Sequence, residues 1–190
     1  VLRDRKMLFI LFIATIPAGV VGALFHKTIE HTLRSPLIIV FSTTAFGILM
    51  LVAEKYGKKN RERSSFADAL FIGTAQAIAL IPGVSRSGIT ITAGLFKNLT
   101  RENAARFSFL LSTPIIGGAM LLEGRKLLHN PAGHNFDLFI TGFLSAFISG
   151  FFAIKFLLNF LKKHPLNIFV YYRFILAAFI LLLWAKKNII

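Results

Sequence analysis

The stretch LIPGVSRSGITITAGLF, residues 80–96, interrupts what would otherwise be a continuous apolar helix. It places a proline, glycines, hydroxyl residues and one arginine between two apolar runs, 66–81 and 89–95. As a helix, residues 69–81 cover about 20 Å, which is short of the roughly 30 Å of a bilayer core. The stretch therefore predicts two half-length helices joined by a break, either as one kinked crossing or as a re-entrant hairpin. Non-helical backbone inside a membrane needs protein or water to satisfy its hydrogen bonds, so both geometries predict a cavity at 82–88.

The rest of the chain consists of apolar runs of helix length. Of its 190 residues, 55% are hydrophobic, and the mean hydropathy is +0.70, as in an integral membrane protein. No run alternates with period two, so an all-α bundle is favoured over a β-barrel. The absence of cysteine excludes disulfides and thiolate metal sites. We expect five crossings, at 7–25, 36–53, 104–122, 136–161 and 168–185.

The formal charge is +14, from 22 Lys and Arg against 8 Asp and Glu. This excess suits contact with anionic membrane lipids or an anionic substrate. Nucleic acid is disfavoured as a partner, because the basic residues lie in short loops and form no continuous face. Arg3, Arg5 and Lys6 share a side with the basic cluster at 55–63, which we assign to the cytoplasm.

Two parts of the chain resemble each other. IPAGVVGALF at 16–25 is echoed by FISGFFAIKF at 147–156, and SPLI or HPLN opens the next apolar run in each case. The echo indicates a duplicated membrane unit, with ordinary small-residue helix packing as the alternative. On the duplicated interpretation, the single transmembrane domain 1–190 divides into the remainder of a first repeat, 1–65, and a second repeat, 66–190, with its hairpin at 66–98. Because the chain opens on Val1, we expect it to be a fragment.

The polar groups of the break describe an anion site: Arg86, the hydroxyls of Ser85, Ser87 and Thr90, and two glycines that permit close backbone approach, Gly83 and Gly88. An arginine near the middle of a bilayer costs several kcal/mol unless it is paired or hydrated, so it indicates function. The start of the second half-helix adds N–H groups and a positive dipole end. An arginine fork matches phosphate oxygens, so we expect a phosphate ligand. The alternative is that Arg86 snorkels toward the interface.

Hydrolysis of a phosphate also needs an acid, a base or a metal. All eight carboxylates fall in loops or at the ends of apolar runs, far from Arg86 in the sequence pattern. Gln76 lies in the first half-helix, before the break. Two roles are open for it: it orients a ligand, or it bridges two helices. We predict no metal site from the histidines, which lack metal-ligand spacing: His26, His31, His129, His134 and His164.

PGVSRSGITITAG, with AQAIAL before it and RFSFLLSTP after it, resembles the second signature region of the bacterial undecaprenyl-pyrophosphate phosphatases of the bacitracin-resistance type. The resemblance implies a multi-pass enzyme of the bacterial inner membrane that removes the terminal phosphate from undecaprenyl pyrophosphate and so recycles the lipid carrier of cell-wall synthesis. It also implies inverted repeats, each with a re-entrant hairpin, whose tips meet in a cavity. By the same resemblance, Arg86 clamps the pyrophosphate beside Ser85 and Ser87, Thr90 completes the pocket, and Gln76 matches a polar position.

The other signature of that family, an acidic ExxxE run followed by serines and a histidine, has no match in this chain. The resemblance implies that those residues hold a divalent cation, Mg²⁺ or Ca²⁺. We therefore expect the metal ligands outside this chain and expect the isolated chain to be inactive. The expected partner is a polyprenyl pyrophosphate lipid, and a homodimer stays open.

Two other functions are open. A transporter or flippase for an anionic lipid or solute is the first, since inverted repeats with broken helices also build transporters. A structural membrane subunit is the second, but it leaves Arg86 unexplained.

Overall fold

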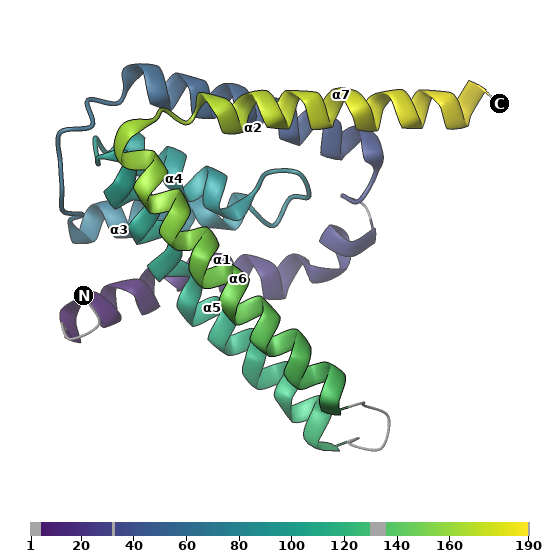
Figure 1. Cartoon of the computed structure of the whole chain (residues 1–190), viewed down its shortest axis with the longest axis horizontal. Coiled ribbons are helices and arrows are strands. Elements are labelled where there is room, and N and C mark those ends of the chain that lie inside the picture. Colours follow the sequence, from purple (N-terminus) through teal and green to yellow (C-terminus); the bar gives the residue numbers. More distant parts are fainter. Residues whose placement is uncertain (1–4, 32, 130–135, 190) are drawn as a thin grey trace.

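The computed structural model describes residues 5–31, 33–129 and 136–189, and within these ranges the regular structure is helical. Figure 1 shows the helices in chain order: α1 (Arg5–His31), α2 (Pro36–Tyr56), α3 (Phe66–Ile78), α4 (Arg86–Phe96), α5 (Arg101–His129), α6 (Phe136–Lys163) and α7 (Asn167–Ile189).

Five of these helices contain segments long and apolar enough to cross a membrane: Met7–Phe25, Pro36–Tyr56, Arg101–Leu121, Asp137–Lys163 and Asn167–Lys187. They confirm the five predicted crossings, and the largest differences are at Tyr56, against 53 in the prediction, and at Arg101, against 104. The predicted all-helical, multi-pass membrane bundle is therefore correct. The division into repeats at residues 65 and 66 stays a prediction.

Helices α3 and α4 form the predicted broken unit. With 13 and 11 residues they are about 20 and 17 Å long, so neither crosses a bilayer alone. The end of α4 returns to the segment that precedes α3, because the N–H groups of Asn60 and Arg61 both donate to the Asn98 carbonyl, at 3.1 and 2.9 Å. Lys97 also lies over the Phe71 ring of α3, 4.3 Å from its centre. The unit is therefore a hairpin whose two ends lie on one side, and the kinked-crossing alternative is wrong.

The first turn of α3 is fixed by a reciprocal cap. The Ser65 hydroxyl accepts from the Asp68 N–H at 3.2 Å, and the Asp68 carboxylate accepts from the Ser65 N–H at 2.8 Å. Arg61 pairs with the same carboxylate at 2.8 Å. Burial acts to raise the pKa of Asp68, but the hydrogen bonds from Ser65 and Arg61 outweigh it and lower this pKa below its ordinary value.

Helices α1, α2 and α5 pack around this hairpin. Helix α3 packs against α1, α4 packs against α2 and α5, and α2 lies along α7. In Figure 1, α5 and α6 run side by side away from the rest of the molecule. The large apolar side chains that α6 exposes, such as Phe143, Phe147 and Phe151, suit contact with lipid tails. The break between α3 and α4 lies against α2 and α7, because side chains of these two helices donate hydrogen bonds to its carbonyls.

The crossing of α1 and α3 generates the first prediction. A methyl group at Gly73 would overlap the backbone of Ala14, whereas one at Gly19 of α1 would meet nothing within 4 Å. We expect Gly73→Ala to separate the two helices and lower the melting temperature in detergent. Gly19→Ala is the control and should leave it unchanged or slightly higher. Equal melting temperatures for the two variants would contradict this account of the crossing.

Candidate anion site at the break between α3 and α4

The backbone of the break has an unusual conformation at two residues. Gly83 has φ +91°, which suits glycine, but Ser85 has φ +68°, a region that residues with a side chain rarely adopt. Such a conformation costs about 1–3 kcal/mol and persists where the surrounding contacts fix it. A strained residue that also carries a hydroxyl indicates a functional position.

Contacts from α2 and α7 fix the break. The Ser42 hydroxyl donates to the Pro82 carbonyl at 2.5 Å, and the Thr43 hydroxyl donates to the Gly83 carbonyl at 3.2 Å. The guanidinium of Arg173, on α7, donates to the same Gly83 carbonyl at 2.7 Å. Carbonyl groups that no helix can satisfy thus find donors in two neighbouring helices, as backbone within a membrane requires.

Helix α4 begins with N–H groups that are partly free. The Ser85 hydroxyl accepts from the Gly88 N–H at 3.2 Å, and the Ser85 carbonyl accepts from the Ile89 N–H at 3.0 Å. In the described part of the chain, the N–H groups of Arg86 and Ser87 have no acceptor. The positive end of the helix dipole lies at the same place, so the start of α4 favours an anion.

A cavity of about 430 Å³ opens beside this helix start. Its polar side is formed by Thr43, Gly83, Ser85, Ser87, Gly88 and Arg173. Its apolar side includes Ile39, Met50, Leu157, Leu161, Leu166, Phe169 and Leu176, from α2, α6, α7 and the turn between the last two. Polar groups at one side of an apolar cavity suit a ligand with an anionic head and an apolar chain.

The cavity contains four of the predicted site residues, namely Ser85, Ser87, Gly83 and Gly88. Arg86, the predicted clamp, opens α4 and is partly exposed, although it is not among the residues that line the cavity. Its guanidinium has no hydrogen-bond or ion-pair partner among the described residues. Arg86 is therefore available to a ligand, and its role as a clamp stays a prediction.

The structure does not bring the remaining two predicted residues to the cavity. The Thr90 side chain is buried, and its hydroxyl lies 2.6 Å from the Ser108 hydroxyl, which joins α4 to α5. Gln76 is also buried, on the face of α3 that carries Gly73, and its amide has no partner within the described ranges. Thr90 is therefore placed to hold α4 against α5, whereas Gln76 makes no such hydrogen bond. The predicted part of both residues in binding stays untested.

Arg173 is a charged residue of the cavity that was not among the predicted site residues. It lies within the apolar run that was predicted as the last crossing, 168–185, and only 7% of it is exposed. The rule that singled out Arg86, that an arginine within a membrane indicates function, applies equally to Arg173. The signal was therefore present in the sequence as a single cation within YYRFILAAF.

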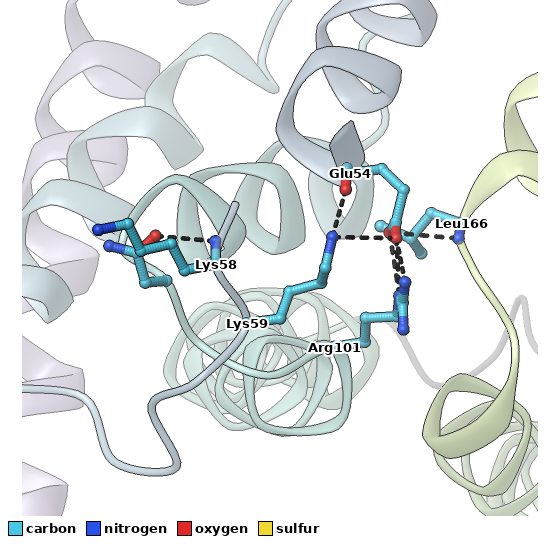
Figure 2. A network of polar contacts seen from close by, with 6 residues as sticks. Glu54, Lys58, Lys59, Arg101 and Leu166 are labelled. Atoms are coloured by element: carbon cyan, nitrogen blue, oxygen red, sulfur yellow. Dashed lines mark hydrogen bonds and ion pairs between the residues drawn. The ribbon is translucent and has the colours of Figure 1, made fainter. Parts of the chain in front are cut away.

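A network of polar contacts around Glu54 reaches Leu166, one of the residues that line the cavity (Figure 2). The carboxylate of Glu54 at the end of α2 accepts from Arg101 Nε at 2.9 Å and from the Leu166 N–H at 3.4 Å, and it pairs with Lys59 at 3.4 Å. It thereby joins α2, the start of α5 and the turn between α6 and α7. Because Leu166 lines the cavity, this network holds part of the cavity wall in place.

The cavity does not provide the ligands of a divalent cation. No acidic residue lines it, and Glu54, Asp68 and Glu102 are engaged by basic side chains. Over the described residues, no group of three or more His, Asp or Glu side chains could hold a metal ion. The His164 ring stacks on the Phe160 ring, with 4.3 Å between the ring centres. The side chains of the other four histidines are not among those that the structure describes.

A family model described as "Bacitracin resistance protein BacA" matches residues 2–179. The chain belongs to this family. A BacA-family relative from Thermodesulfovibrio yellowstonii, named undecaprenyl-diphosphatase, is 59% identical over 98% of this chain and 72% of its own length. Relatives of the same name are 45% identical in Rubrobacter xylanophilus, over 93% of the chain and 66% of the relative, and 46% identical in Elusimicrobium minutum, over 95% and 69%. The chain thus spans about two thirds of the length of these BacA-family proteins.

The Glu54 network generates the second prediction. Glu54→Gln leaves Arg101 and Lys59 beside a neutral amide, so we expect a clear loss of thermal stability. Glu102→Gln is the matched control, because Glu102 pairs with Arg106 and Lys162 at a more exposed site and should change stability little. Melting curves in detergent compare the two, and an equal effect would show that the network does not support this BacA-family fold.

Proposed function

We propose that this chain is part of an undecaprenyl-diphosphatase of the bacterial inner membrane and provides the phosphate-binding half of its active site. The whole enzyme hydrolyses undecaprenyl pyrophosphate to undecaprenyl phosphate and inorganic phosphate, and so recycles the lipid carrier of cell-wall synthesis. The observation that carries the proposal is the start of α4, with its free N–H groups and hydroxyls, at the polar side of an apolar cavity. The BacA-family membership and the names of its relatives support the same activity and give no support to the transporter alternative.

The site suits this substrate at both ends. The terminal phosphate accepts hydrogen bonds from Ser85, Ser87 and the free N–H groups, with the Arg86 fork as its clamp. The apolar side of the cavity takes the first part of the polyprenyl chain. Phosphoryl transfer depends on positioning and on neutralising charge at the phosphate oxygens, and these groups provide both. During hydrolysis the oxygen of a water molecule bonds to the terminal phosphorus and the water gives up a proton. The bond between that phosphorus and the bridging oxygen breaks, inorganic phosphate is released, and the bridging oxygen stays with undecaprenyl phosphate.

The acid or base and the metal come from elsewhere. We propose that Mg²⁺ or Ca²⁺ takes part and that its carboxylate ligands lie outside residues 1–190, because the residues of the cavity do not fit it. No step derived from this chain's residues runs through the metal. A homodimer stays a prediction.

The third prediction concerns the clamp. In the protein as its gene encodes it, Arg86→Ala should lower phosphate release from undecaprenyl pyrophosphate by about 10²–10³-fold, since the phosphate loses a charged donor. Arg106→Ala changes an exposed arginine on α5 and serves as the control. Retention of more than a few per cent of activity by Arg86→Ala would remove Arg86 from the site.

The fourth prediction concerns the missing carboxylates. Residues 1–190 alone, purified in detergent and shown to be folded by a cooperative melting transition, should release essentially no phosphate with Mg²⁺ or Ca²⁺ present. No carboxylate in the cavity can activate water or hold the metal. Robust turnover would show that the described residues contain a complete catalytic site.

A further inference from the structure

Arg173 is a cation buried within an apolar helix. Placing a guanidinium at membrane depth costs several kcal/mol unless its charge or its hydrogen bonds are compensated. No ion pair found among the described residues involves it. Its hydrogen bonds go instead to two backbone carbonyls, from Nη2 to Gly83 at 2.7 Å and from Nε and Nη2 to Thr43 at 3.3 Å each. The side chain therefore acts on the backbone of α2 and of the break.

The Gly83 carbonyl is the point where these contacts meet. It accepts from Arg173 and also from the Thr43 hydroxyl. A side chain at Gly83 has no room, since its Cβ would lie 2.7 Å from the Ile39 carbonyl oxygen of α2. A carbonyl left without a donor away from water destabilises the fold, so the break is stable only where these donors reach it. The guanidinium of Arg173 thus determines the position of the Gly83 backbone relative to α2.

We propose that Arg173 is a positioning residue of the phosphatase reaction. By holding the Gly83 carbonyl, it aims Ser85, Ser87 and the free N–H groups of α4 into the cavity. This inference rests on the proposed function. Ser85 follows Gly83 by two residues and already has a strained φ, so a displaced Gly83 moves the donors that face the phosphate. A displacement of about 1 Å in a catalytic site can lower the rate on the order of 100-fold.

The test measures kcat and KM for undecaprenyl pyrophosphate in the protein as its gene encodes it. Arg173→Gln should lower kcat on the order of 100-fold and change KM little, because the apolar side of the cavity is retained. Arg173→Lys should recover part of the loss, since its ammonium can still donate to the Gly83 carbonyl. Thr43→Val should lower kcat in the same direction, and its effect should overlap with that of Arg173→Gln in the double variant, because both side chains act on one carbonyl.

The controls separate the possible failures. Arg106→Gln, at an exposed arginine, should keep the wild-type kcat, and melting temperatures report whether each variant folds. A wild-type kcat in folded Arg173→Gln overturns the inference, as does a loss carried by KM alone. If Arg173→Gln does not fold, Thr43→Val serves as the test, because Thr43 donates to the same Gly83 carbonyl. An unchanged kcat in Thr43→Val would then overturn the inference. If the wild-type protein itself releases no phosphate, the proposed function is wrong.

Discussion

Each backbone carbonyl inside a membrane needs a hydrogen-bond donor, and this constraint organises the structure around residues 82–85. Helix α3 ends at Ile78, and Pro82 and Gly83 lie in the non-helical segment that follows, so their carbonyls have no helical partner. Ser42, Thr43 and Arg173 supply the donors. The break therefore requires α2 and α7 beside it, which explains why these two helices, far apart in the sequence, lie together (Figure 1).

The same constraint creates the chemistry of the site. A helix that starts inside the membrane leaves N–H groups that must be satisfied by side chains or by a ligand. Ser85 satisfies one of them, whereas those of Arg86 and Ser87 have no acceptor in the described part of the chain, and Ser87 lines a cavity that has apolar walls on its other side. An anionic lipid head bound here would satisfy the free N–H groups, and its chain would suit the apolar walls. Structure and ligand preference thus have a common physical cause.

The sequence predicted the crossings well, because a bilayer fixes the length of an apolar helix and little else is needed. It also predicted the break, since Pro82 and Gly83 cannot continue a helix. It could not distinguish a hairpin from a kinked crossing, because that choice depends on the contact between Asn98 and Arg61, two residues that lie far apart in the chain. Thr90 and Gln76 were harder still, because the direction of each side chain depends on how α4 and α3 are rotated against their neighbours.

The central claim is that the start of α4 binds the phosphate of a lipid. The most direct measurement is an experimental structure of the protein, as its gene encodes it, with a polyprenyl methylene-diphosphonate that cannot be hydrolysed. We expect phosphonate oxygens within hydrogen-bonding distance of Ser87 and the first N–H groups of α4, with the polyprenyl chain along Leu157 and Phe169. A diphosphonate bound elsewhere, with the start of α4 free of it, would contradict the account.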